Sequence, residues 1–304
     1  MKSANYTNFI TTGKANTNGI ELYYESFGLD TNPVVLLIMG LDAQCVMWSD
    51  AFIEPIVNAG FRVIRFDNRD IGHSTWIENW KKTKPYTLED MALDTVGLLD
   101  FLKIEKAHII GASMGGMITQ RLAISHAQRV LSITCIMSTG FALDGQLEKS
   151  PFRKLFLKMA PKILKYVPVK NRWTNHKTTV EGYLALYKFL SGTKYPFDVR
   201  YFTEVFRYVI LERKGQNPKA RLQQFCAVVA SGSRLNELHK INRPALIIHG
   251  TADKLVPISH SEKLAKNIKN ATFIAMEGIG HEIPRAALSE YHELIFKHLQ
   301  NANS

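Results

Sequence analysis

Three polar residues lie in glycine-containing segments whose spacing could support nucleophilic catalysis. Ser113 stands at the centre of the sequence Gly-Ala-Ser-Met-Gly, directly after an apolar stretch at 107–110 and directly before a segment with helical spacing at 114–126. A serine on such a sharp strand-to-helix turn exposes its hydroxyl above a helix N-terminus, whose N–H groups favour a developing negative charge. Ser113 is therefore the predicted nucleophile, and a glycine-rich turn without chemistry is the alternative interpretation.

A serine hydroxyl needs a general base, and His281 is the candidate among the ten histidines. It lies in the sequence Gly-Ile-Gly-His-Glu-Ile-Pro, where Gly278 and Gly280 allow the loop to present the imidazole. Such a base needs a carboxylate that fixes its tautomer and stabilises the imidazolium. Asp253, which follows the apolar stretch 245–248, is the predicted carboxylate. An aspartate in such a turn is more often a helix cap or the partner of a neighbouring lysine, here Lys254.

The elements that must position these side chains are short apolar strands alternating with helices. Continuous apolar strands of this kind indicate a largely parallel sheet covered on both faces, and the carboxyl ends of parallel strands meet at one edge. Ser113, Asp253 and His281 each follow such a strand, so we expect them to converge. The predicted strands are 19–24, 34–39, 62–66, 107–110, 130–137, 245–248 and 271–276, and the predicted helices are 49–59, 87–102, 114–126, 259–268 and 286–299.

The middle of the chain interrupts this alternation and carries the positive charge. Residues 147–240 hold 19 Lys and Arg but 6 Asp and Glu, a net charge of +13, whereas the whole chain has a formal charge of +11. Amphipathic stretches without the strand pattern predict a helical insertion. We expect a core formed by residues 1–137 and 237–304 and a helical insertion at 138–236, which we call the cap.

Composition sets limits on the class of protein. The 304 residues are 46% hydrophobic and 21% charged, as in an ordinary globular protein. The three cysteines form no Cys-x-x-Cys pair, which argues against a disulfide framework or a thiolate zinc site. The sequence shows neither a signal-peptide pattern nor an apolar run long enough to span a bilayer, and no zinc-finger or RNA-binding motif. We therefore expect a soluble, cytoplasmic protein that binds no nucleic acid.

The motifs together resemble the α/β-hydrolase family. They are GASMGG around Ser113, HGTADKLVP around Asp253, GIGHEIP around His281 and RFDNRDIGHS at 65–74, in the family's order. The resemblance implies a mostly parallel eight-stranded sheet with helices on both faces and an inserted helical cap. Within the family, LLIMGLDAQCVMW and VIRFDNRDIGHST are most similar to the aclacinomycin methylesterase-like carboxylesterases.

One departure from the family pattern concerns the oxyanion hole. The family usually has His-Gly after the first buried strand, whereas this chain has Met39-Gly40-Leu41. The hole needs backbone donors aimed at the developing oxyanion and does not require the imidazole. The resemblance therefore assigns the hole to the N–H groups of Leu41 and Met114, with Gly40 among the substrate-binding residues.

The cap is the expected cover of the active site. An apolar stripe at i, i+3, i+4 and i+7, from Phe152 to Met159, predicts an amphipathic helix with a basic opposite face. A solvated face is the favoured interpretation, and weak contact with an anionic membrane surface is the alternative. Aromatic side chains in a helical cap more often serve packing, but five of them are candidates to line the pocket: Trp173, Tyr183, Tyr187, Phe189 and Phe225. Of these, Trp173 and Tyr187 are the predicted substrate-binding residues.

The predicted function is hydrolysis of small-molecule carboxylic esters through an acyl-enzyme intermediate on Ser113. This chemistry requires no metal and no organic cofactor. The alternatives are a C–C bond hydrolase, a lactonase or a perhydrolase with the same three residues, or a catalytically weak binding protein with a hydrolase fold. We expect a monomer or homodimer.

Overall fold

An eight-stranded sheet forms the centre of the computed structural model, which describes residues 10–141 and 176–303. The strand order is β1-β2-β4-β3-β5-β6-β7-β8, and β2 pairs antiparallel with β1 and with β4, whereas the other pairs are parallel. The predicted eight-stranded, mostly parallel sheet is confirmed. The strands are β1 (Ile10–Thr17), β2 (Ile20–Phe27), β3 (Val34–Ile38), β4 (Arg62–Phe66), β5 (Ala107–Ala112), β6 (Val130–Ile136), β7 (Ala245–Gly250) and β8 (Ala271–Met276).

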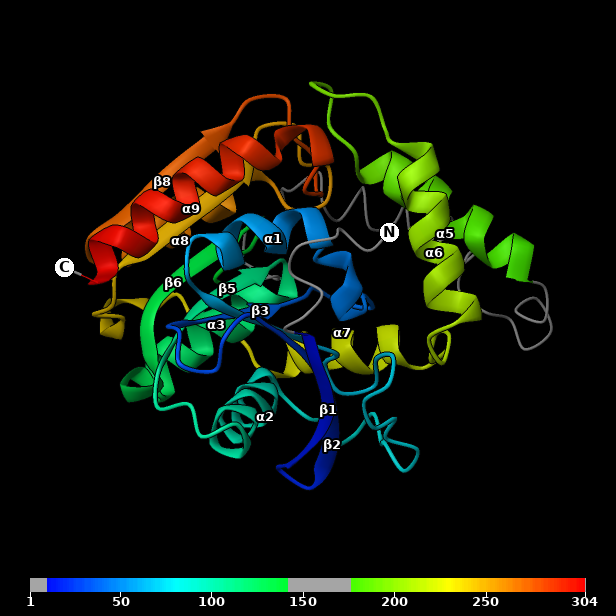
Figure 1. The fold of residues 1–304 in the computed structure, drawn as a ribbon, viewed down its shortest axis with the longest axis horizontal. Helices are drawn as coiled ribbons and strands as arrows, with labels where there is room; N and C mark the ends of the chain where they lie inside the picture. Colours follow the sequence, from blue (N-terminus) through cyan, green and yellow to red (C-terminus); the bar gives the residue numbers. More distant parts are fainter. Residues whose placement is uncertain (1–9, 142–175, 304) are drawn as a thin grey trace.

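Helices cover both faces of this sheet. In Figure 1, α1 and α9 lie on one side of the strands and α2 and α3 on the other. The core helices are α1 (Asp50–Asn58), α2 (Leu88–Phe101), α3 (Met114–Ser125), α8 (Ile258–Asn267) and α9 (Leu288–Asn303). The described residues also form short 3₁₀ helices, namely η2 (Cys45–Met47), η3 (Ala127–Arg129), η5 (Leu238–Lys240) and η6 (Arg285–Ala287).

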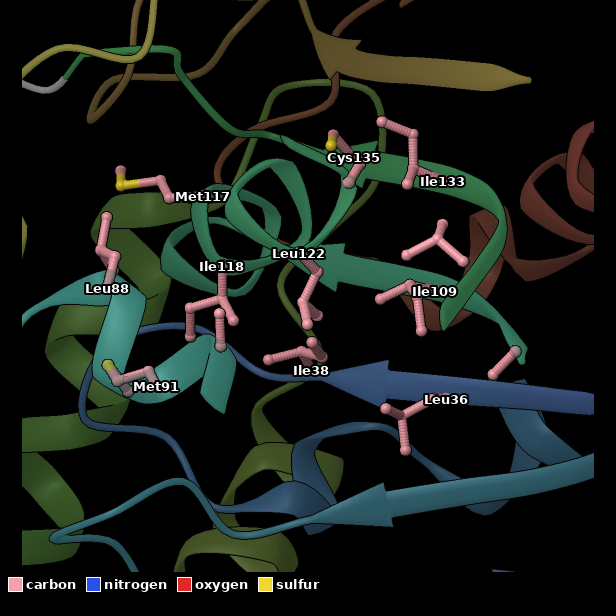
Figure 2. Packing of buried hydrophobic residues seen from close by; sticks show 14 of the residues in the cluster. Leu36, Ile38, Leu88, Met91, Ile109, Met117, Ile118, Leu122, Ile133 and Cys135 are labelled. Atoms are coloured by element: carbon pink, nitrogen blue, oxygen red, sulfur yellow. The ribbon is translucent and has the colours of Figure 1, made fainter. Parts of the chain in front are cut away.

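Alternate residues of each strand enter two separate hydrophobic cores, because successive side chains of a strand point to opposite faces. In β3, Val35 and Leu37 pack with the side chains of α1 and α9, whereas Leu36 and Ile38 pack with those of α2, α3 and α8. Figure 2 shows the second core between the sheet and α3. Burial on both faces explains why β3 is apolar throughout.

The sequence predicted seven of the eight strands, and the exception is β1. Its sequence ITTGKANT has no apolar run, and only two of its eight residues are buried, because it is an edge strand paired on one side. The predicted capping box of α2 is present, with Thr87 and Asp90 each bonding the other's backbone N–H.

Three helices of the cap are described: α5 (His176–Leu190), α6 (Val199–Leu211) and α7 (Ala220–Ala230). Figure 1 shows α5 and α6 beside the core. They pack on each other through an aromatic cluster that includes Tyr183, Phe202 and Phe206. The predicted helix at 152–159 and Trp173 fall in 142–175, outside the described residues. No helix in the described part of the chain is both long and apolar enough to cross a membrane.

Part of the cap's positive charge points inward, against the core. Arg213 is buried and forms ion pairs of 2.7 Å with Glu25 of β2 and with Asp67 after β4. Arg234 is also buried and donates to Gln120 Oε1 and to the carbonyl oxygen of Thr139. These arginines fasten the cap segment to the core, so the net charge of this segment overstates the charge that it presents to solvent.

Replacement of Arg213 by methionine should destabilise the protein by about 3–5 kcal/mol at neutral pH, because it removes the cation paired with buried Asp67 and leaves buried Glu25 with Arg65 alone. Burial raises the pKa of Glu25, but the charges of Arg65 and Arg213 outweigh it and hold that pKa below its usual value. The stability that a lowered carboxyl pKa provides is present above the unfolded-state pKa and is lost as the pH falls.

The free energy of unfolding that Arg213→Met loses should therefore be smaller at about pH 4 than at neutral pH. Urea denaturation of the variant and of the unchanged protein at the two pH values measures this difference. Arg207→Met, at an exposed arginine of α6, is the matched control and should change the free energy little. Equal losses at the two pH values would contradict the proposed electrostatic cause.

Candidate active site

Ser113 occupies a strained turn between β5 and α3. Its φ of 54° and ψ of −116° lie in a region that non-glycine residues rarely adopt. The turn is possible because Gly115 lets α3 approach β3, since a Cβ atom at this glycine would lie 2.0 Å from the carbonyl oxygen of Ile38. The predicted strand, turn and helix around Ser113 are thus all present.

The structure brings the three residues singled out in the sequence into one hydrogen-bonded chain. His281 Nε2 lies 3.0 Å from Ser113 Oγ, and His281 Nδ1 lies 2.7 Å from Asp253 Oδ2. They come from the loops after β5, β7 and β8, which reach the same edge because these strands are parallel. This is the arrangement in which an imidazole can accept a serine proton while a carboxylate stabilises the imidazolium.

The loop that carries His281 is held tightly against the cap. Gly278 has a φ of 69°, in the left-handed region that favours glycine. A Cβ atom on Gly280 would lie 2.2 Å from the carbonyl oxygen of Leu190, the last residue of α5. The same carbonyl accepts a 2.8 Å hydrogen bond from His281 N–H. The two glycines therefore allow the close contact that fixes the backbone of His281.

Asp253 is surrounded by donors that hold it as an anion. Its Oδ1 accepts 2.8 Å hydrogen bonds from the N–H groups of Leu255 and Val256, and its side chain is fully buried. Burial alone raises its pKa, but the charge of His281 and the hydrogen bonds from His249 and His281 hold that pKa well below its usual range. Asp253 is thus ionised throughout the range in which a histidine exchanges its proton.

His249 is a neighbour of Asp253 to which sequence analysis gave no role. Its Nε2 lies 3.2 Å from Asp253 Oδ2 and 2.9 Å from the carbonyl oxygen of Val256. It lies four positions before Asp253, in the strand end that the family motif already contains. The carboxylate therefore faces two imidazoles, of which only His281 reaches Ser113.

The predicted oxyanion donors lie next to the serine. A Cβ atom on Gly40 would approach Ser113 Cβ to 3.1 Å, so glycine at this position lets the loop after β3 pass beside the serine. Leu41 and Met114 line the same cavity as Ser113 and His281. Within residues 10–141 and 176–303, no hydrogen bond occupies the backbone N–H of either residue. Two amides are thus available beside the serine hydroxyl.

A cavity of about 650 Å³ lies above Ser113, between the core and the cap. Of the candidate aromatic residues, Tyr183, Tyr187 and Phe225 line it together with Gly40, whereas Phe189 lies under the Lys254 ammonium instead. The remaining walls are mostly apolar and come from both parts of the chain, among them Met39, Met47, Trp48, Phe52, Met117, Met137, Leu186, Leu190, Phe202 and Leu222. Among the described residues, no group of three or more His, Cys, Asp or Glu side chains could hold a metal ion.

Comparison with known proteins identifies the family of the chain. The alpha/beta hydrolase fold family matches residues 33–284, which is most of the chain. The protein belongs to the α/β-hydrolase family. Among solved structures, this α/β-hydrolase is similar to a thermophilic esterase from Thermogutta terrifontis, with a TM-score of 0.73 and 21% identity, covering 97% of this chain and 100% of that one.

Curated relatives of this α/β-hydrolase include ester and lactone hydrolases. Rhodomycin D methylesterase DnrP of Streptomyces peucetius is 27% identical over 294 residues, covering 93% of this chain and 96% of the relative. 3-Oxoadipate enol-lactonase 1 of Acinetobacter baylyi is 26% identical over 261 residues, covering 84% of each. The resemblance to the methylesterase-like group inferred from the sequence is confirmed.

Proposed function

We propose that the protein is a serine carboxylesterase that hydrolyses small-molecule esters through an acyl-enzyme intermediate. The observation that supports this function most strongly is the hydrogen-bonded chain from Ser113 through His281 to Asp253 at the base of a large cavity. The methylesterase relatives, which match over nearly the whole chain, support ester hydrolysis as the reaction class.

The first half of the reaction acylates the serine. Ser113 Oγ attacks the ester carbonyl while His281 Nε2 takes its proton, and Asp253 stabilises the resulting imidazolium. The N–H groups of Leu41 and Met114 donate to the oxyanion of the tetrahedral intermediate. As the intermediate collapses, His281 gives its proton to the leaving alkoxide, which departs as the alcohol and leaves an ester on Ser113.

The second half of the reaction regenerates the enzyme. Water attacks the acyl carbon while His281 accepts one of its protons, and a second tetrahedral oxyanion forms between the same two amides. Its collapse breaks the bond to Ser113 Oγ, which recovers a proton from His281. The product is the free carboxylic acid, and every proton that His281 accepts is returned.

The cavity indicates the kind of ester. A volume of about 650 Å³ lies within the range of pockets that enclose drug-sized ligands, and the walls are mostly apolar. A bulky apolar ester buries more of these walls than an acetate does, and each additional buried methylene contributes about 0.8 kcal/mol. We therefore infer that the enzyme prefers bulky apolar esters. The enol-lactonase relative favours lactones as the second candidate class.

A substrate panel tests this function. We expect kcat/KM for p-nitrophenyl esters to rise from acetate to longer acyl chains, and methyl esters of polycyclic aromatic acids to be hydrolysed. Tyr187→Ala, which removes part of the cavity wall, should lower kcat/KM for the bulky esters more than for acetate. If the enzyme hydrolyses no member of the panel faster than buffer alone does, the proposal is refuted. If a lactone tested beside the esters has the highest kcat/KM, lactones replace esters as the preferred class.

A further inference from the structure

Asp42 occupies an unusual position directly after the predicted oxyanion donor Leu41. It lies in the loop at residues 39–45, which we call the oxyanion loop, and has a positive φ of 63°. It is a buried carboxylate, only 8% exposed. A charged side chain in such surroundings needs compensating partners, and a non-glycine residue at positive φ needs contacts that hold it there.

Two helices of the cap provide these partners. Arg221 of α7 donates to Asp42 Oδ2 from Nε at 2.8 Å and also from Nη2, and Tyr183 of α5 donates to the same oxygen at 3.2 Å. Gln224, one helical turn after Arg221, accepts the Asp42 N–H on Oε1 at 2.8 Å. The Asp42 backbone and side chain are thus both bound by α7.

Gln224 is itself fixed by the core. Its Nε2 donates a 3.1 Å hydrogen bond to the carbonyl oxygen of Arg69, and its side chain is fully buried. Gln224 does not line the cavity, whereas Arg221 does. The glutamine therefore connects the Asp42 backbone to the loop after β4 without contacting the space that a substrate would occupy.

Core residues also bond to the two ends of the oxyanion loop. Asn68 Nδ2 donates to the carbonyl oxygen of Met39 at 3.0 Å, and Asp67 Oδ1 accepts from Cys45 N–H at 2.8 Å. The peptide unit that carries the Leu41 N–H joins residues 40 and 41. Asn68 holds the preceding peptide unit, between residues 39 and 40, through the Met39 carbonyl. Gln224 holds the following peptide unit, between residues 41 and 42, through the Asp42 N–H.

We propose that Gln224 and Arg221 are positioning residues that aim the Leu41 N–H at the reacting carbonyl oxygen. The inference rests on the proposed serine esterase function, in which that N–H is one of two oxyanion donors. Because the next peptide unit is held by α7, the oxyanion hole is complete only when the cap is seated on the core.

Gln224→Met provides the sharpest test, because it removes the acceptor of the Asp42 N–H and leaves the cavity walls unchanged. We expect kcat to fall about 10- to 100-fold with KM changed less than threefold, since complete loss of an oxyanion donor costs roughly 10²–10³ in kcat. The inhibition constant of an arylboronic acid, which forms a tetrahedral adduct with the serine, should rise in parallel with the loss in kcat.

Gln223→Met is the matched control, at the neighbouring glutamine of α7. Gln223 is also fully buried, and it donates to the backbone carbonyl of Ile77, which lies outside the oxyanion loop. Gln224→Met loses two buried hydrogen bonds and Gln223→Met loses one, so we expect both variants to lose thermal stability, and Gln224→Met the more. Only Gln224→Met should lower kcat and raise the inhibition constant of the boronic acid.

Arg221 provides a second route to the same result. Arg221→Lys keeps a cation for Asp42 and should retain more of kcat than Arg221→Gln, which leaves the buried carboxylate without its partner. If Gln224→Met does not fold, the comparison of Arg221→Lys with Arg221→Gln tests the positioning role instead. Equal kcat in the two Arg221 variants, or equal kcat in Gln224→Met and Gln223→Met, would overturn the inference.

The proposed function and this inference fail in different ways. If Ser113→Ala retains turnover, the serine mechanism is wrong and the oxyanion assignment falls with it. If Ser113→Ala is inactive while Gln224→Met keeps the kcat of Gln223→Met, the esterase proposal stands and only the positioning role is refuted.

Discussion

Replacement of Ser113 by alanine is expected to lower kcat for every hydrolysed ester by about 10⁴–10⁶-fold, because no acyl-enzyme can then form. The oxyanion amides and the cavity remain in this variant, so the residual rate should still exceed that of water alone. KM should change little, since the hydroxyl contributes almost nothing to the walls of the cavity.

Initial rates of p-nitrophenyl ester hydrolysis measure this effect, with thermal unfolding as a check that the variant is folded. Ser125→Ala is the matched control, because Ser125 lies at the other end of α3, is exposed, and bonds only to Glu89 among the described residues. It should retain full activity. A Ser113→Ala enzyme with more than a hundredth of the original kcat would contradict a serine nucleophile.

Replacement of Asp253 by asparagine is expected to lower kcat by about 10³–10⁴-fold at neutral pH. An asparagine amide can donate to His281 Nδ1, which places the imidazole proton on Nε2, where it can no longer accept the Ser113 proton. The amide also lacks the negative charge that stabilises the imidazolium in the transition state. The loss should therefore appear in kcat rather than in KM.

The pH profile of kcat/KM measures the Asp253→Asn effect. Asp30→Asn is the control, because the Asp30 carboxylate is 83% exposed and, among the described residues, pairs only with the Arg62 side chain. We expect this control to keep both the rate and the profile. An Asp253→Asn enzyme within tenfold of the original rate would show that the carboxylate does not serve His281.

The apolar strands and the motifs around them could be predicted from the sequence, because both carry local signals. Strands buried on both faces are rich in apolar residues, so β3 to β7 are visible in the sequence, whereas the polar edge strand β1 is not. Ser113, Asp253 and His281 each follow a recognisable strand. A parallel sheet then requires that their loops share one edge, which the structure shows.

The contacts between cap and core could not be predicted, because they join residues far apart in the chain. Asp42 and Gln224 are separated by 182 positions, and Glu25 and Arg213 by 188. A charge count places Arg213 and Arg234 in a basic segment, but it does not reveal which side chains of that segment point toward the core. The sequence therefore predicted the three proposed catalytic residues, but not the network that positions the loop beside them.

Mapping of a covalent inhibitor tests the central claim most directly. A fluorophosphonate reacts with an activated serine, whose Oγ displaces fluoride and forms a stable phosphonate ester. We predict one adduct per chain, located by peptide mass spectrometry on Ser113, with loss of esterase activity in proportion to labelling and no adduct in Ser113→Ala. An adduct on another residue, or full activity after complete labelling of Ser113, would contradict the account.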